Sequence, residues 1–189
     1  MSDIADTIQE TIENAGEGRL NSKIAILVAI TATFMALCNV KDGNVVQAMS
    51  QAQAHGLDAW SYYQAKSTKQ SIAENAVDLL KFDNKPGSDV LIQKYEEKIA
   101  RYETEKAAIQ AKAEGFEKEY EAINVFDDQF DMTDAFLSIA IAMFGITALT
   151  QKTWLFYFSC LLSVSGWIFG LAAFMHFSLH SDIISRILG

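Results

Sequence analysis

Residues 154–179 read WLFYFSCLLSVSGWIFGLAAFMHFSL and contain no Asp, Glu, Lys or Arg. Two further stretches are nearly free of charge: residues 24–40 (IAILVAITATFMALCNV), and residues 133–150, in which Asp134 stands near the start. A helix needs about 20 apolar residues to cross a bilayer, within a usual range of about 17–25. The chain is therefore predicted to be an all-α integral membrane protein with three transmembrane helices. We expect the spans at residues 23–40, 132–150 and 153–179.

Two other interpretations of these stretches are weaker. Three buried helices of a soluble domain would need the rest of the chain to wrap them, and the rest is too polar to do so. A cleaved signal peptide would begin with a basic region and end at a small-residue cleavage site. Instead, the residues before the first stretch are acidic and no such site follows Cys38, so a retained signal-anchor is favoured.

The orientation of the spans follows from short basic flanks. Only residues 150–153 separate the second and third stretches, so these two helices are expected to form a tight antiparallel hairpin. Arg19 and Lys23 precede the first span, and Lys152 lies in the short turn. Basic residues favour the cytoplasmic side. We therefore expect a cytoplasmic N-terminus, with the long segment between the first two spans on the other side of the membrane.

The overall composition excludes several classes of protein. The chain has 189 residues, a net charge of −9, one proline and two cysteines. A nucleic-acid binder needs a basic face to displace counterions, and two cysteines are too few for a disulfide framework. Few turn residues also disfavour an all-β or low-complexity chain.

Residues 41–131 are predicted to form an extramembrane antiparallel helical hairpin, a coiled-coil stalk. Residues 81–89 (KFDNKPGSD) hold the only proline and a Pro-Gly turn signal. After this turn, apolar residues recur every three to four positions, broken only at Lys106 and Asp127, which is a coiled-coil pattern. They are Ile92, Tyr95, Ile99, Tyr102, Ile109, Ala113, Phe116, Tyr120, Ile123 and Phe130. Residues 1–22 form an amphipathic acidic leader with a hinge expected at residues 16–18, Asp42-Gly43 is the expected kink after the first span, and residues 180–189 form a short tail.

Each predicted span carries small residues at helical spacing, which is the pattern by which helices associate in lipid. These stripes could pack the three helices of one chain together, or they could join several chains. Three stripes are more than one intramolecular contact requires, so a homo-oligomer is expected. The stripes are Ala25, Ala29, Ala32 and Ala36; Ala135, Ser138, Ala142 and Gly145; and Ser159, Ser163, Gly166, Gly170 and Ala173.

Few residues are candidates for chemistry. His176 and His180 share a helical spacing that suits a metal, but no further ligand is evident, and interfacial histidines are the simpler interpretation. Cys38 and Cys160 are expected to be packing residues. No phosphate loop, nucleophile elbow or zinc-binding pair occurs. We therefore expect a protein that is not an enzyme and has no metal or cofactor.

An acidic collar is predicted where the second span begins. It consists of Asp127, Asp128, Asp131 and Asp134. Several copies around an axis could concentrate cations at a pore mouth. Equally, acidic residues here could complement a helix dipole and face water. No charged residue lies in the middle of any predicted span, and this counts against a pump or secondary transporter.

Residues 58–67 read DAWSYYQAKS. This stretch resembles the D-x-W-x-Y/F-Y/F-Q-A-K-S/T signature of a bacterial membrane-protein family of unknown function, the DUF4337 type, and the second-span region is also similar to that family. The resemblance implies one span, a long helical segment and a terminal membrane hairpin in a bacterial inner membrane, which would make the stalk periplasmic. Many relatives carry a His-rich leader, which this chain lacks. The resemblance implies no activity.

The signature also contains the densest aromatic cluster of the stalk. Its predicted contact surface consists of Trp60, Tyr62, Tyr63, Gln64 and Lys66. Aromatic anchors of this kind serve either a partner protein or neighbouring copy, or the seam of the hairpin itself. Together these patterns predict a self-associating, non-enzymatic scaffold or accessory subunit in contact with lipid. The alternative is an oligomeric ion or small-solute channel with the acidic collar at its mouth.

Overall fold

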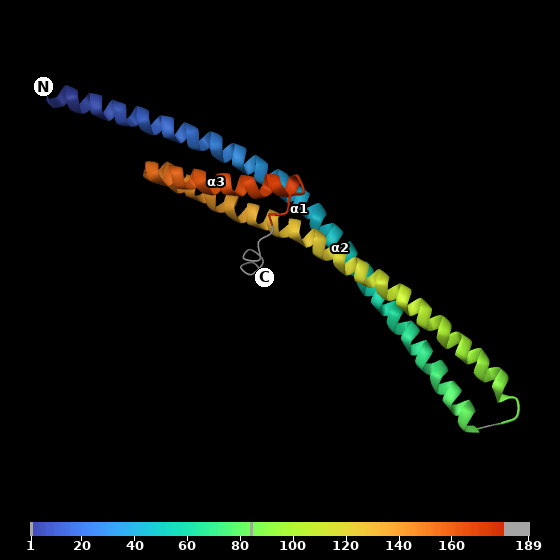
Figure 1. Cartoon of the computed structure of the whole chain (residues 1–189). Helices are drawn as coiled ribbons and strands as arrows, with labels where there is room; N and C mark the ends of the chain where they lie inside the picture. Colours follow the sequence, from blue (N-terminus) through green and yellow to red (C-terminus); the bar gives the residue numbers. More distant parts are fainter. Residues whose placement is uncertain (1, 84, 180–189) are drawn as a thin grey trace. The chain divides into compact units, whose positions relative to one another are not determined.

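Three α-helices make up the part of the chain that the structure describes. The computed structural model describes residues 2–83 and 85–179, with side chains from residue 18 onward. Helix α1 covers Ser2–Asp83, α2 covers Ser88–Thr150 and α3 covers Thr153–Phe174 (Figure 1). The described residues contain no strand, so the all-helical prediction is confirmed. Each helix contains a segment long and apolar enough to cross a membrane.

The chain divides into two compact units, which we call the bundle and the hairpin. The bundle comprises the chain up to Val46 and from Asn124 onward, and the hairpin comprises Gln47–Ile123. Helices α1 and α2 each contribute to both units, whereas α3 belongs to the bundle alone.

The core of the bundle is aromatic and aliphatic. Phe34 stacks on Trp167 with ring centroids 4.0 Å apart, and Leu137 is fully buried in the same cluster. A second cluster surrounds Phe144, also fully buried, together with Ile24. One side-chain oxygen each of Asp42, Gln129, Asp134 and Gln151 is buried without a hydrogen-bond partner, but the buried hydroxyls of the core are hydrogen-bonded locally or across helices. For example, the hydroxyls of Thr31 on α1 and Ser163 on α3 are hydrogen-bonded at 3.1 Å.

The hairpin is an antiparallel pair of helices whose contacting faces differ in the size of their side chains. The buried residues of α1 are mostly small, including Ala52, Ala59 and Ala73, and they allow α2 to approach closely. The seam that was predicted on α2 supplies the larger side chains, and from Ile92 to Ile123 all of its members are buried or half-buried. An ion pair between Lys81 and Glu96, with nitrogen and oxygen 3.0 Å apart, joins the helices near the turn.

The two connections are shorter than the sequence indicated. Helix α1 continues to Asp83, and α2 begins at Ser88, whose N–H donates to the Lys85 carbonyl at 3.1 Å. Gly87 has φ +93°, a conformation that glycine adopts without strain. The second connection consists of Gln151 and Lys152 alone, and the N–H of Gln151 donates to the Thr147 carbonyl at 2.9 Å.

Three boundary predictions need correction. Helix α3 ends at Phe174 rather than at residue 179, because Met175 and then His176, with φ +56°, leave the helical conformation. Helix α1 also runs without interruption through residues 16–18, where a hinge was predicted, and through Gly43, where a kink was predicted. The tail at 180–189 and the side chains of the leader up to residue 17 lie outside the described residues.

Candidate functional site

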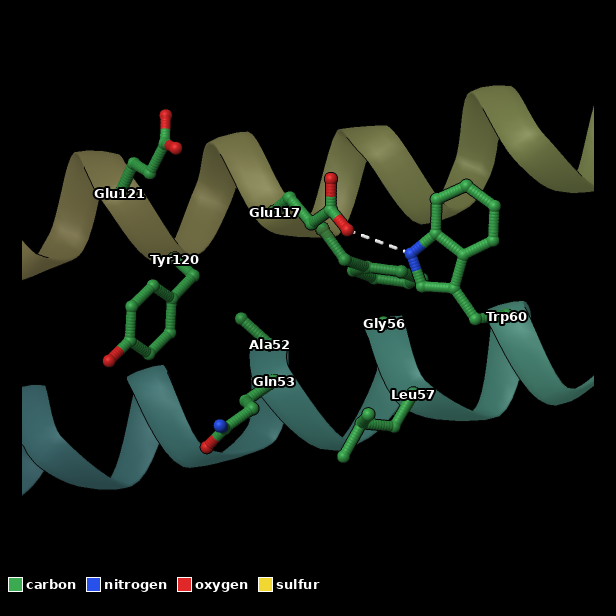
Figure 2. A pocket seen from close by; sticks show the side chains of 9 residues that line it. Ala52, Gln53, Gly56, Leu57, Trp60, Glu117, Tyr120 and Glu121 are labelled. Carbon is green, nitrogen blue, oxygen red and sulfur yellow. Dashed lines mark hydrogen bonds between the residues drawn. The ribbon is translucent and has the colours of Figure 1, made fainter.

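Trp60 of the aromatic cluster lines an open groove of about 380 Å³ between α1 and α2, together with Phe116 and Tyr120 of α2. Figure 2 shows the Trp60 indole reaching from α1 toward α2, where its N–H donates to the Glu117 carboxylate at 2.7 Å. Ala52 and Gly56 form the α1 side of the groove, and Tyr120 lies further along on α2. Trp60 also meets Tyr63 edge-on, with centroids 5.6 Å apart. The tryptophan therefore joins the two arms of its own chain.

Lys66 is the second link across the hairpin. Its ammonium forms an ion pair with Glu105 and lies 5.2 Å from the Tyr62 ring and 5.4 Å from the Tyr102 ring. The hydrogen bond to Glu105 raises the pKa of Lys66, and the same bond lowers the pKa of Glu105. Both groups thus remain charged across the physiological range.

Of the five predicted contact residues, three contact the other helix of the hairpin and two are exposed. Trp60, Tyr63 and Lys66 contact α2, with Lys106 placed 5.6 Å from the Tyr63 ring. Gln64 is exposed, and Tyr62 is 54% exposed. For the first three, the structure favours the alternative interpretation of the cluster as part of the hairpin seam. Glu117 and Glu105 were not predicted, since only the antiparallel register places them opposite Trp60 and Lys66.

We expect Trp60→Phe to lower the free energy of unfolding of the hairpin by about 1 kcal/mol, because the ring is retained but the N–H donor to Glu117 is lost. Chemical denaturation of the full chain in detergent, followed by circular dichroism, measures this, because the substitution removes the hairpin's own tryptophan. A cycle with Glu117→Ala should show coupling of about 0.5–1 kcal/mol. Glu121→Ala, in the same groove, serves as the control. Additive effects of Trp60→Phe and Glu117→Ala would contradict the link.

The acidic collar in the bundle includes a carboxylate that was not predicted from the sequence. Asp42 of α1 shares a hydrogen bond with Asp127, and Asp131 and Asp134 lie close enough to add their charge. Burial, followed by the charges of Asp127 and Asp131, raises the pKa of Asp42 to about 6 from an ordinary value of 3.8. Burial also raises the pKa values of Asp127 and Asp131, with Asp128 adding to both. The collar is thus built by two helices, and Asp42 keeps its proton up to about pH 6.

This proton makes the stability of the bundle depend on pH. Since the folded pKa of Asp42 lies above its unfolded value, the folded chain binds the proton more tightly, and stability falls as pH rises from about 4 to about 6. Asp42→Asn should remove that loss. Above pH 6 the free energy of unfolding of the variant should exceed that of the parent by about 1–2 kcal/mol, a figure that allows for the screening of a half-buried charge by solvent. Both chains should be similar near pH 4. Thermal melts between pH 4 and 8 measure the difference, and parallel curves would contradict it.

The three small-residue stripes have different environments. The third is buried throughout: Gly166 lies against Leu137, where an added Cβ would be 2.5 Å from Cδ2, and Gly170 lies against Phe34. This stripe packs α3 against its own chain. The other two stripes are exposed throughout. They consist of Ala25, Ala29, Ala32 and Ala36 on α1, and of Ala135, Ser138, Ala142 and Gly145 on α2.

A family model describing a domain of unknown function (DUF4337) matches residues 20–176. The chain belongs to the DUF4337 family. This confirms the resemblance carried by residues 58–67. Neither a curated protein nor a solved structure matches the chain.

The remaining residues of this DUF4337 chain that were considered for chemistry are two histidines and two cysteines. His176 is exposed beyond the end of α3 and meets Phe126 edge-on at 5.2 Å, and His180 lies outside the described residues. The helical spacing that suggested a shared metal therefore does not apply, because α3 has already ended. Within the described residues, no group of three or more His, Cys, Asp or Glu side chains could hold a metal ion. Cys38 is buried and Cys160 is partly buried, and neither forms a disulfide.

Proposed function

We propose that this DUF4337 protein is a self-associating, non-enzymatic protein of the bacterial inner membrane that acts as a scaffold or accessory subunit. In this proposal the bundle spans the membrane three times, and the hairpin is the extramembrane coiled-coil stalk. A cytoplasmic N-terminus and a periplasmic hairpin follow from the basic residues near the ends of the spans.

Membrane insertion is supported by what the bundle leaves exposed. Ile26, Ile30 and Leu37 on α1 are 51–60% exposed, and Leu161 and Val164 on α3 are 63% and 56% exposed. Contiguous apolar surface of this extent is rare on a soluble monomer, whereas lipid solvates it at no cost. The helices are also long enough, since each contains an apolar window of transmembrane length.

Self-association is supported chiefly by the two exposed small-residue stripes. Apolar helices gain nothing by leaving lipid unless their backbones approach closely, and small residues permit that approach. The chain uses its third stripe for this purpose internally, against Leu137 and Phe34. The stripes through Ala29 on α1 and Ala142 on α2 have the same chemistry and are exposed, although Ser138 of the second stripe is hydrogen-bonded to the Met35 sulfur of α1.

The mass of the purified protein in lipid nanodiscs tests this proposal. We expect a mass of two or more chains of 20.9 kDa at micromolar concentration. Ala29→Leu and Ala142→Leu should each reduce the fraction of oligomer by about tenfold or more, since each adds bulk to a close contact. Ile30→Leu, exposed but off the stripe, is the matched control. A single chain in every lipid tested would contradict the proposal.

One observation favours a channel as the second candidate. The collar gathers carboxylates from α1 and α2 at one end of the bundle, with Asp42 beside Asp127. Repeated around an axis, such a ring would attract cations. Conductance in planar bilayers that is lost in Asp127→Asn and Asp131→Asn would support the channel. An assembly that does not conduct would leave the scaffold as the only one of the two candidates.

A further inference from the structure

One face of α1 in the hairpin is both exposed and free of charge. Gln53, Leu57, Gln64, Ile72, Asn75 and Leu79 are all exposed. At about 100° per residue, these six positions fall within an arc of about 100° on the helix. No Asp, Glu, Lys or Arg shares that arc between residues 53 and 82, where the intervening positions are mainly Ser, Thr and Ala. The buried residues Ala59 and Val77 lie on the opposite side, against α2.

The other arm of the hairpin differs sharply. Residues 88–123 contain fifteen Asp, Glu, Lys and Arg, whereas residues 50–82 contain six. Charged positions on α2 keep its outer surface in water. On α1, by contrast, Leu57 and Ile72 are each 62% exposed and Leu79 is 70% exposed. These three large aliphatic side chains, on an uncharged face of a helix in water, gain free energy when the face is covered.

We propose that this uncharged face of α1 binds the same face of a second copy, as a parallel pair related by a two-fold axis. The proposal rests on the self-association proposed above and names the surface that forms it outside the membrane. Amides and hydroxyls both donate and accept hydrogen bonds, so Gln64 and Asn75 can pair with their own symmetry copies. A charged face would repel its copy, and the chain as a whole carries −9.

The size of the face fits a contact between tethered copies. Residues 53–79 span about 40 Å of helix, and a helix about 10 Å wide would bury about 400 Å² per copy. The total of about 800 Å² is below the roughly 1,200–2,000 Å² of stable complexes between free proteins. Copies held in one membrane share their orientation and meet at high effective concentration, so a small contact suffices. The shared orientation also makes the pair parallel, which places each residue opposite itself.

Cysteine crosslinking in native membranes tests the pairing with the full chain. Asn75→Cys should form a disulfide with its own copy under mild oxidation. Ala100→Cys, exposed on the other arm, is the matched control, and the wild-type chain gives the background of its two natural cysteines. We expect about a tenfold excess of crosslinked dimer at position 75, lost when Ile72→Glu is added. Ile72 is exposed, so this change leaves the hairpin itself intact, as circular dichroism should verify.

The outcomes separate this inference from the proposed function. An oligomer in nanodiscs without preferential crosslinking at position 75, or with crosslinking that Ile72→Glu leaves unchanged, would overturn the paired face and keep self-association. Crosslinking of Asn75→Cys to a different protein would also overturn it. A wild-type chain that is monomeric in every lipid would remove both proposals together.

Discussion

Phe144→Ala is expected to lower the free energy of unfolding of the bundle by about 3–5 kcal/mol. Phe144 is fully buried on α2, packed with Ile24 of α1 and with Phe156 of α3, whose ring centroid is 6.1 Å away. Truncation removes contacts with both other helices and leaves a cavity that the surrounding side chains fill only in part. Unfolding by SDS titration in mixed micelles, followed by circular dichroism, measures the loss.

The control makes the same chemical change on the surface of the bundle. Phe158 on α3 is 43% exposed, and Phe158→Ala should cost about 1 kcal/mol or less, since much of the ring faces outward. Equal losses for the two variants would mean that the buried and exposed faces of the bundle are assigned wrongly. The comparison therefore tests the rotation of α2 and α3 as well as the core.

The helical fold class and the order of the helices could be predicted from the sequence, because long apolar stretches and long helical patterns leave few alternatives. The uncharged stretches and the Pro86-Gly87 turn together require three helices. The end of α3 was not accessible, since Met175 and Phe177 are as apolar as the residues before them. The helix ends where the backbone changes at His176, and composition carries no signal for that change.

The small-residue stripes show the limit of pattern reading most clearly. All three have the same chemistry and spacing, yet only the one through Gly166 and Gly170 is buried. Spacing identifies a face but not its partner, which depends on how each helix is rotated in the bundle. The same limit explains why Trp60 was open to two interpretations until the register of the hairpin placed Glu117 opposite it.

Asp42 was missed for a different reason. The acids predicted for the collar all lie on α2, whereas antiparallel spans necessarily bring the residues just after the first span next to those just before the second. Asp42 follows the first apolar stretch by two residues, and Asp127 precedes the second by six. Topology alone could therefore have predicted that they meet, although the shared hydrogen bond required side-chain positions.

Gly166→Ala is expected to destabilise the bundle by about 1–3 kcal/mol, although alanine is the better helix former. The new Cβ would lie 2.5 Å from Cδ2 and 2.7 Å from Cγ of Leu137, and 3.2 Å from the Cβ of Phe136. Leu137 is fully buried, so any shift that makes room for the methyl disturbs the core cluster around it. Gly43→Ala is the control, because nothing lies within 4 Å of its added Cβ and Gly43 belongs to none of the stripes. It should leave the unfolding of the bundle unchanged or stabilise it by up to about 1 kcal/mol.

A double-mutant cycle identifies the cause of the loss. Leu137→Ala alone should cost about 2–5 kcal/mol, since it empties a fully buried site. In that background the extra methyl of Gly166→Ala enters the vacated space. The loss of unfolding free energy in the double variant should therefore be smaller than the sum of the two single losses by about 1 kcal/mol or more. Losses that simply add would mean that α3 does not approach α2 at Gly166, and the third stripe would then have to be assigned, like the other two, to a contact outside the chain.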